Sequence, residues 1–254
     1  MSTKNKIALV TGGSRGLGKD MAINLAKKGL NVILTYNSNK QEADNVVAEI
    51  QSLGQKAGAF QLNVSDPKSF DDFVSNVKTY LVEKENNPNF DFLINNAGFI
   101  HYANLDQTTE EQFDDMLNIH FKGPFFLTQK LLPFINENGG IVNVSSALTR
   151  FASPGFGTYA AMKGAMEKYT LYLAKELGDR KIRANIVAPG VIETDIMGGA
   201  VRDNTEMKQY LASQIALGRV GLPDDIGGVV AFLCTDEARW INAQCIEISG
   251  GQSL

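Results

Sequence analysis

Tyr159 and Lys163, four residues apart, are the first pair of side chains that could do acid–base chemistry. In a helix, residues at i and i+4 lie on one face, so the two side chains would point the same way. An isolated tyrosine titrates near pKa ~10 and is a poor acid–base group at neutral pH. A lysine cation one turn away favours the phenolate and would lower that pKa. The pair predicts a proton-transferring site on a helix, although such pairs also occur by chance.

A second candidate is the pair of hydroxyls that ends the segment Val142-Asn-Val-Ser-Ser146. The apolar residues before them are typical of a buried strand. Side chains at the carboxyl edge of a parallel sheet face the ligand crevice, so Ser146 could contact a substrate. A capping or turn role is the alternative, and it suits Ser145 better than the pair.

The third candidate is a glycine-rich turn, Thr11-Gly-Gly-Ser-Arg-Gly-Leu-Gly18. Gly12, Gly16 and Gly18 follow an expected strand and open an expected helix. Glycine lets the chain turn tightly and lets the backbone approach a pyrophosphate at the helix N-terminus. The spacing is wider than the usual dinucleotide fingerprint, and a purely structural tight turn would also explain it.

These candidates need a scaffold, and the chain alternates short apolar runs with longer amphipathic stretches. The expected strands are Ile7–Thr11, Asn31–Tyr36, Gly58–Asn63, Phe90–Asn95, Gly140–Ser145, Arg183–Ala188 and Gln244–Ile248. The expected helices are Gly16–Lys28, Gln41–Leu53, Pro67–Glu85, Glu110–Pro133, Thr158–Leu177, Thr205–Ala216 and Asp224–Thr235.

Signals at the helix ends support these assignments. Asp66 before Pro67 is typical of an N-cap with proline in the first turn, and Gly29 and Gly54 are typical of helix C-termini. Several of the runs are apolar throughout, as in strands that are covered on both faces. Strand–helix alternation predicts right-handed crossovers. We therefore expect a single α/β domain over residues 1–254, with a Rossmann-type, doubly wound, seven-stranded parallel sheet.

Composition excludes several classes of protein. The 24 basic and 28 acidic residues give a net charge of −4, which is opposite to the balance of a nucleic-acid binder. Two cysteines and two histidines do not suggest a disulfide framework or a metal site. No run approaches the length of a membrane span, and no targeting segment is apparent. We expect no metal, no nucleic acid and no membrane as partners, and a cytoplasmic location.

Taken together, the motifs resemble the short-chain dehydrogenase/reductase family. The resemblance rests on Thr11-Gly-x-x-x-Gly-x-Gly18, Asn95-Asn-Ala-Gly98, Ser146, Tyr159-x-x-x-Lys163 and Pro189-Gly190 in the family's order and spacing. It covers residues 6–251, and it looks most like the 3-oxoacyl-carrier-protein reductase and ketoreductase branch. Each motif is loose, but their conjunction is specific.

The resemblance implies a role for each matching residue. Tyr159 would protonate the carbonyl oxygen as hydride arrives from nicotinamide, Lys163 would hold the ribose and lower the tyrosine pKa, and Ser146 would hydrogen-bond the substrate carbonyl. Residues around the rest of the cofactor would be Gly12, Ser14, Arg15, Gly16, Leu17, Gly18, Asn63, Val64, Asn96, Ala97, Gly98, Pro189, Gly190, Ile192 and Thr194.

One position departs from the family pattern. The family usually has an asparagine three residues before a glycine in its fourth helix, and Gly123 places His120 there. Asn118 lies two residues earlier, about 200° around a helix, so both cannot face the site. The register favours His120 as the fourth catalytic residue, acting through its ring or through its backbone carbonyl. There are two alternatives. His120 could simply pack within the helix without a catalytic role, or a local kink could turn Asn118 toward the site as the fourth catalytic residue.

The second strand indicates the cofactor. NAD-specific sites normally place an acid after this strand to bind the ribose diol. Here Tyr36, Asn37 and Ser38 follow, and Arg15 could meet a 2′-phosphate. We therefore expect NADP(H) to be favoured over NAD(H), although Tyr36 and Asn37 could also bind an unphosphorylated ribose.

These observations predict an NADP(H)-dependent oxidoreductase that reduces a small-molecule ketone or oxidises the matching alcohol. Apolar residues expected near the substrate are Tyr102, Leu148, Phe151, Phe156, Met197, Met207 and Tyr210. The resemblance also implies a homotetramer. Three alternatives stay open: a 3-oxoacyl-carrier-protein reductase docking through Arg180 and Lys181, an NAD-dependent sugar or steroid dehydrogenase, and a non-catalytic dinucleotide sensor.

Overall fold

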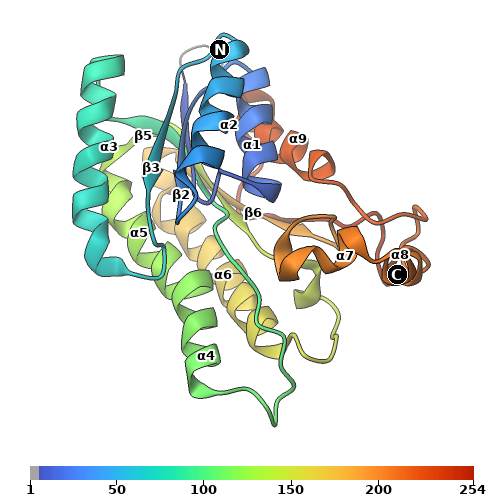
Figure 1. The fold of residues 1–254 in the computed structure, drawn as a ribbon. Coiled ribbons are helices and arrows are strands. Elements are labelled where there is room, and N and C mark those ends of the chain that lie inside the picture. Colours follow the sequence, from blue (N-terminus) through green and yellow to red (C-terminus); the bar gives the residue numbers. More distant parts are fainter. Residues whose placement is uncertain (1–5) are drawn as a thin grey trace.

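Strand–helix alternation builds one α/β domain in the computed structural model, which describes residues 6–254. Within that range, seven parallel strands form a single sheet in the order β3-β2-β1-β4-β5-β6-β7 (Figure 1). The strands are β1 (Ile7–Val10), β2 (Asn31–Tyr36), β3 (Ala57–Gln61), β4 (Phe90–Asn95), β5 (Ile135–Val144), β6 (Arg183–Pro189) and β7 (Cys245–Ile248). The predicted doubly wound fold is confirmed.

Helices cover both faces of this sheet. They are α1 (Gly16–Lys27), α2 (Lys40–Ser52), α3 (Phe70–Glu85), α4 (Glu110–Leu117), α5 (Gly123–Leu131), α6 (Gly157–Glu176), α7 (Ala200–Asp203), α8 (Thr205–Ala212) and α9 (Asp224–Leu233). Asp66 accepts a hydrogen bond from the Lys68 amide, as its predicted capping role requires. Gly29 and Gly54 follow α1 and α2 with φ of +90° and +84°, which glycine adopts without strain.

The sheet divides the apolar interior into two cores. Successive strand residues point to opposite faces, so Ala8 and Val10 of β1 join one core and Ile7 and Leu9 the other. The first core packs against α1, α2 and α9, and the second against α3, α5 and α6 (Figure 1). Both faces being covered explains why the strands are almost continuously apolar.

The predicted helix over 110–133 is wrong in its middle. A π-helical turn, Asn118–Lys122, separates α4 from α5. Pro124 has no backbone N–H and its ring would clash with the His120 carbonyl in a regular α-helix. In addition, a Cβ on Gly123 would lie 2.0 Å from the Val64 carbonyl oxygen, so the helix passes very close to the loop after β3. The wider turn accommodates both constraints, and it leaves the His120 carbonyl without its α-helical donor.

Two further boundaries differ from the prediction. Strand β5 begins at Ile135 rather than 140, because its pairing with β4 shifts register between Phe90 and Phe92 and carries a bulge there. The helix expected over 205–216 ends at Ala212, since Ile215 forms a β-bridge with Gln252 instead. The short helix α7 was not predicted. None of the helices between residues 6 and 254 combines the length and the apolar character that crossing a bilayer requires.

Candidate active site

The candidate residues meet at the carboxyl edge of the sheet. The chain adds β2 and β3 on one side of β1 and then crosses to β4 on the other side. Loops leaving β1 and β4 therefore diverge in opposite directions and open a crevice between them, which is where ligands bind in such sheets. The glycine-rich turn follows β1 and the Asn-Ala-Gly segment follows β4.

Close packing explains the glycines of the turn. Gly12 has φ of +65°, and a Cβ on Gly18 would lie 2.1 Å from the Gly12 carbonyl oxygen. Two polar side chains then hold the turn in place: Thr35 Oγ1 accepts from the Gly12 amide at 3.0 Å, and Asn96 Nδ2 donates to the Thr11 carbonyl at 2.9 Å. Thr35, and Thr11, whose hydroxyl accepts from the amides of Asn96 and Ala97, carry structural roles that the sequence did not reveal.

The other side of the turn fits a phosphate group. Gly16 has φ of +54°, and the nearest atoms to a Cβ there belong to Thr194, at 3.9 Å. Arg15 occupies the N-cap of α1 with an exposed side chain that does not cap the helix, and the first turn contains no acid within this described segment. The first amides of α1 are therefore capped by no side chain from Arg15, and a helix N-terminus of this kind can bind a pyrophosphate.

The remaining residues expected at the cofactor lie along the same edge. Ser14 and Leu17 are half-buried in the turn, Asn63 and Val64 follow β3, and Ala97 packs against Gly12. Tyr36 ends β2, with Asn37 and Ser38 exposed after it. Across the crevice, β6 leads into Pro189, Gly190, Ile192 and Thr194. Ile192 forms a β-bridge with Gly221, so its backbone is fixed.

Ser146, Tyr159 and Lys163 converge below this crevice. Tyr159 and Lys163 are buried on one face of α6, with the Lys163 Nζ 5.6 Å from the centroid of the tyrosine ring. Ser146 follows β5, and its side chain is close enough to the Tyr159 hydroxyl to oppose the rise in the tyrosine pKa. Lys163 Nζ donates to the Val144 carbonyl at 2.7 Å, one strand residue before the serines. Two hydroxyls and one amine therefore lie at the start of α6 and the end of β5.

Burial dominates the electrostatics of these groups. It raises the pKa of Tyr159 to about 12, and the neighbouring Ser146 side chain opposes this only in part. It also lowers the pKa of Lys163 to about 7. The expectation that the tyrosine pKa is lowered by Lys163 is therefore wrong, because burial raises it. Desolvation disfavours both charged forms, and the amine is held at the Val144 carbonyl, with its nitrogen over the tyrosine ring.

His120 lies against the same tyrosine. Its ring meets the Tyr159 ring edge-on, with centroids 4.9 Å apart, and its Nε2 donates to the Phe99 carbonyl at 2.6 Å. That bond fixes the proton on Nε2, so Nδ1 is an acceptor, and it finds no partner in the described part of the chain. Burial and the nearby Lys163 hold the pKa of the imidazole well below its usual range. Gly98 leaves room for the ring, since a Cβ there would lie 2.5 Å from Cε1.

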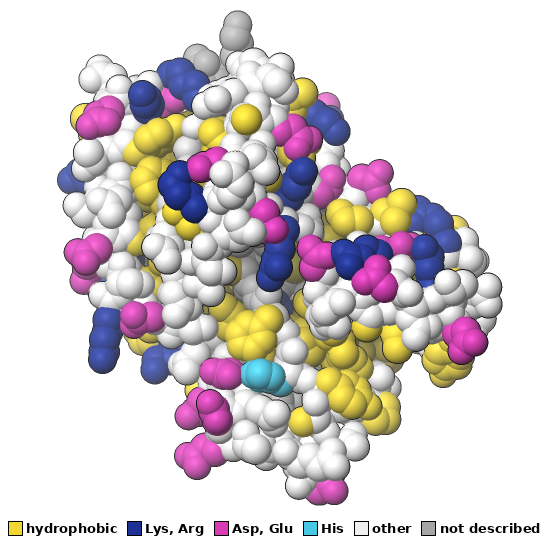
Figure 2. Space-filling model, viewed as in Figure 1, with side chains coloured by type: hydrophobic (Ala, Val, Ile, Leu, Met, Phe, Trp, Pro, Cys, Tyr) yellow, Lys and Arg dark blue, Asp and Glu magenta, His cyan; other side chains and the backbone are white. Residues whose placement is uncertain are grey.

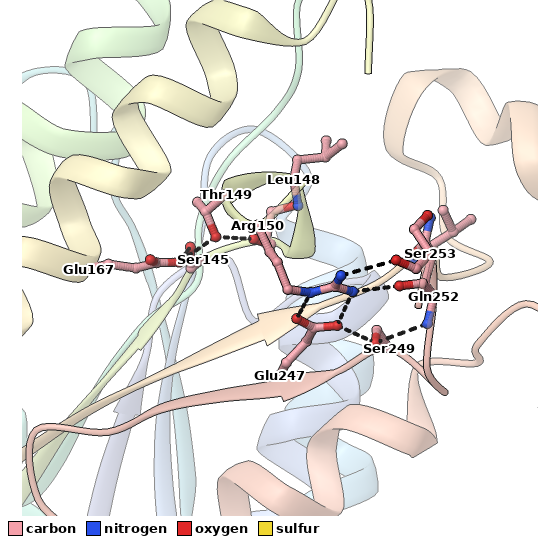
Figure 3. Close-up of polar contacts among 11 residues, drawn as sticks. Ser145, Leu148, Thr149, Arg150, Glu167, Glu247, Ser249, Gln252 and Ser253 are labelled. Carbon is pink, nitrogen blue, oxygen red and sulfur yellow. Dashed lines mark hydrogen bonds and ion pairs between the residues drawn. The ribbon is translucent and has the colours of Figure 1, made fainter. Parts of the chain in front are cut away.

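The sequence did not predict the residues that hold the turn after Ser146 in place. Arg150 donates through Nε and Nη2 to the Glu247 carboxylate, at 2.7 and 2.8 Å, and also to the carbonyls of Gln252 and Ser253 (Figure 3). We call residues 249–253 the C-terminal strap. Its Gln252 side chain also accepts from the Val191 amide at 3.0 Å, so the strap joins the loop after β5 to the loop after β6.

The substrate side of the crevice is apolar and bordered by acids. Tyr102 packs edge-on against Phe156, and a Cβ on Gly155 would lie 2.2 Å from the Tyr102 ring, so the loops after β4 and β5 are in contact. His101 pairs with Asp115 at 3.0 Å. Acidic residues gather around the start of α4, and Figure 2 shows magenta side chains next to a histidine on this face. They are Asp106, Glu110, Glu111, Asp114 and Asp115.

Comparison with known proteins gives consistent relatives. A family model described as enoyl-(acyl carrier protein) reductase matches residues 12–253. An uncharacterized oxidoreductase of Methylorubrum extorquens is 38% identical over 248 residues, covering 98% of each chain. The 3-oxoacyl-[acyl-carrier-protein] reductase FabG of Staphylococcus aureus is 37% identical over 251 residues, again covering 98% of each chain.

Solved structures agree with this assignment. The promiscuous reductase LugOII, which catalyses keto-reduction at C1 during lugdunomycin biosynthesis, superposes with a TM-score of 0.95 at 37% identity, covering all of both chains. The angucycline C-6 ketoreductase LanV with bound NADP superposes with a TM-score of 0.94 at 36% identity, covering 99% of this chain and 97% of that one. With its glycine turn, its Ser–Tyr–Lys cluster and these relatives, the chain belongs to the short-chain dehydrogenase/reductase family and is an oxidoreductase acting on carbonyl or CH–OH groups with NAD(P).

Proposed function

We propose that the chain reduces a free ketone to a secondary alcohol with NADPH, or catalyses the reverse oxidation, through Ser146, Tyr159 and Lys163. The observation that carries this proposal is that the Ser146 side chain lies beside the buried Tyr159 hydroxyl, with the Lys163 amine next to the tyrosine ring. Two hydroxyls paired in this way can both turn to one carbonyl oxygen. LanV, similar over almost its whole length, was solved with bound NADP.

Tyr159 would act as the general acid. With its pKa raised to about 12, its hydroxyl keeps its proton at neutral pH and can donate it to the oxygen of a ketone. Ser146 Oγ accepts from the Leu148 amide at 3.3 Å, so its own proton is free to be donated to the same oxygen. Reduced nicotinamide supplies the hydride when it is bound. Donors placed where negative charge develops are a large source of rate enhancement.

Lys163 and the turn after β1 would hold the cofactor. The Lys163 ammonium has three donors, one of which bonds to Val144, and the others can reach ribose hydroxyls. The first amides of α1 would bind the pyrophosphate. Arg15 would meet a 2′-phosphate, because no acid follows β2 to bind a ribose diol.

His120 would contribute its backbone carbonyl to proton transfer toward Lys163, through a bridging water. Pro124 deprives that carbonyl of its α-helical donor, so the oxygen is available. The imidazole is less suited to relay protons, since its Nε2 proton is bonded to Phe99 and its pKa is well below neutrality.

The substrate that fits this site best is an uncharged, largely apolar ketone. Exposed apolar side chains at the substrate side include Phe99, Tyr102, Met197 and Tyr210. A carrier-protein thioester is the second candidate, favoured by the likeness to FabG. An acidic carrier needs basic residues near the entrance. Arg180, expected to serve, instead donates to the Leu132 and Ile135 carbonyls, and the start of α4 is acidic.

Initial rates test the proposal. We expect a fused-ring aryl ketone to be reduced with NADPH faster than with NADH, and acetoacetyl carrier protein to react no faster than the free acetoacetyl thioester. A strong preference for the carrier-bound thioester would replace our substrate with the second candidate. Tyr159→Phe should lower kcat by at least about 100-fold while NADPH fluorescence titration shows unchanged binding. Near-normal turnover in that variant would remove Tyr159 from the mechanism.

A further inference from the structure

A carboxylate holds the serine segment against the catalytic helix. Glu167 lies on α6, one turn after Lys163 and two turns after Tyr159, so it shares their side of the helix. Its Oε1 accepts hydrogen bonds from Ser145 Oγ at 2.6 Å and from Thr149 Oγ1 at 2.7 Å (Figure 3). The two donors lie on either side of Ser146 in the sequence.

The segment that Glu167 binds is a single tight turn around Ser146. The Thr149 amide donates to the Ser146 carbonyl at 3.1 Å, and the Leu148 amide reaches the Ser146 hydroxyl at 3.3 Å. Thr149 Oγ1 also lies 2.9 Å from the Ser146 carbonyl oxygen, so its hydroxyl proton is shared between that oxygen and Glu167. Moving Glu167 therefore moves the turn that carries the Ser146 hydroxyl.

Polar contacts hold this turn on two sides. Arg150 ties the far end of it to β7 and the C-terminal strap, and that attachment lies on the side away from α6 (Figure 3). Toward α6, where Leu148 also packs against the core, the polar contact is made by a carboxylate with two hydroxyls. Hydrogen bonds to an ionised acceptor are shorter and stronger than neutral ones, and both observed distances are short.

We propose that Glu167 is a positioning residue, which keeps the Ser146 hydroxyl at the distance from Tyr159 where both can bond to one carbonyl oxygen. It does not touch the substrate, and it acts on Ser146 through Ser145 and Thr149. This inference rests on the proposed function, because it requires Ser146 to bond to the substrate.

Substitutions separate positioning from stability. Glu167→Leu should lower kcat by up to about 100-fold, the effect expected from a misplacement of about 1 Å, and leave the KM for NADPH unchanged. Glu167→Gln keeps an acceptor oxygen in place and should restore most of the rate. The double variant Ser145→Ala/Thr149→Val should reproduce Glu167→Leu. Glu176→Leu, an exposed acid on the same helix, is the matched control and should behave as wild type.

The decisive measurement is Glu167→Leu in a Ser146→Ala background. If Glu167 acts through Ser146, the second substitution adds no further loss of kcat. An undiminished loss would show a general structural role and overturn the proposal. Wild-type kcat in Ser146→Ala alone would instead overturn the role of Ser146 in the proposed function.

Amide hydrogen exchange then tests the contact of Glu167 with Ser145 and Thr149 without any substrate. Glu167→Leu should speed exchange at Leu148 and Thr149, whose amides are bonded within the turn. Unchanged exchange there would overturn the positioning role whether or not the enzyme reduces ketones. The same measurement on Ser145→Ala/Thr149→Val covers the case in which Glu167→Leu does not fold.

Discussion

Replacing His120 with alanine should separate the role of the imidazole from that of the backbone. The ring is buried, with 3% of its surface exposed, and it bonds to the Phe99 carbonyl and packs on Tyr159. The bond to the Phe99 carbonyl is only partly buried, so its loss costs about 1 kcal/mol, the lower end of the range for an unsatisfied carbonyl, and an aromatic contact contributes about 0.5–1.5 kcal/mol. The free energy of unfolding should therefore fall by about 1.5–2.5 kcal/mol. The backbone carbonyl stays, so kcat should fall by less than about tenfold, within the effect of one hydrogen bond.

The pH dependence provides a second readout. The pKa of His120 is depressed in the folded protein from an ordinary value of 6.5. Its stabilising effect is therefore complete above pH 6.5 and is lost as the pH falls below it, by up to about 1.4 kcal/mol per pH unit. His120→Ala should remove this slope, whereas His101→Gln, at the other histidine, should keep it.

Urea unfolding across pH 5 to 8 and the pH profile of kcat together decide the question. A fall in kcat beyond about 100-fold, with the loss of an ionisation between pH 5 and 8, would show that the imidazole carries the proton and would refute this reasoning. His120→Asn should match His120→Ala in its kcat profile, since any residue supplies the carbonyl.

Three other predictions concern the cofactor and the assembly. Arg15→Ala should weaken NADPH about 10–150-fold, the loss expected from one charge-assisted bond of 1.5–3 kcal/mol, and leave NADH unchanged; equal losses for both would mean that Arg15 is structural. Because burial lowers the pKa of Lys163 to about 7, its ammonium is present below pH 7 and lost above it. NADPH binding at pH 8 should therefore take up a proton, measured calorimetrically in two buffers, and Lys163→Met should abolish that uptake. The expected homotetramer would use α5 and α6, where Leu171 and Tyr172 are 42% and 60% exposed; Leu171→Asp should give smaller particles by mass photometry, and an unchanged mass would contradict it.

The fold followed from local patterns in the sequence. Apolar runs such as Leu9 to Val10 and Ile33 to Leu34 are buried on both faces, so their composition indicates parallel strands directly. The capping residues Asp66, Gly29 and Gly54 also lie at helix ends in the structure. Their positions were predictable because a cap interacts only with the nearest turn of its helix.

Features that depend on distant contacts were not predictable. The π-helical turn at Asn118–Lys122 involves Gly123 and the Val64 carbonyl, which come together only in the folded chain. Spacing placed Lys163 one turn from Tyr159 but could not show how strongly burial opposes charge, and so the sign of the tyrosine pKa shift was wrong. Glu167 carries no motif of its own, and its role is visible only in its hydrogen bonds.

The C-terminal strap also affects when the site can form during synthesis. Arg150 donates to the carbonyls of Gln252 and Ser253, which are synthesised about a hundred residues after it. The Val191 amide likewise has no Gln252 side chain to bond to until that residue has been synthesised. A chain leaving the ribosome can pair β1 to β6 in order, yet the loops after β5 and β6 gain these restraints only once residues 249–253 emerge. We expect a nascent chain arrested after β6 to have a folded sheet and to bind little substrate. Translation of residues 249–253 would then be the step at which the site is completed.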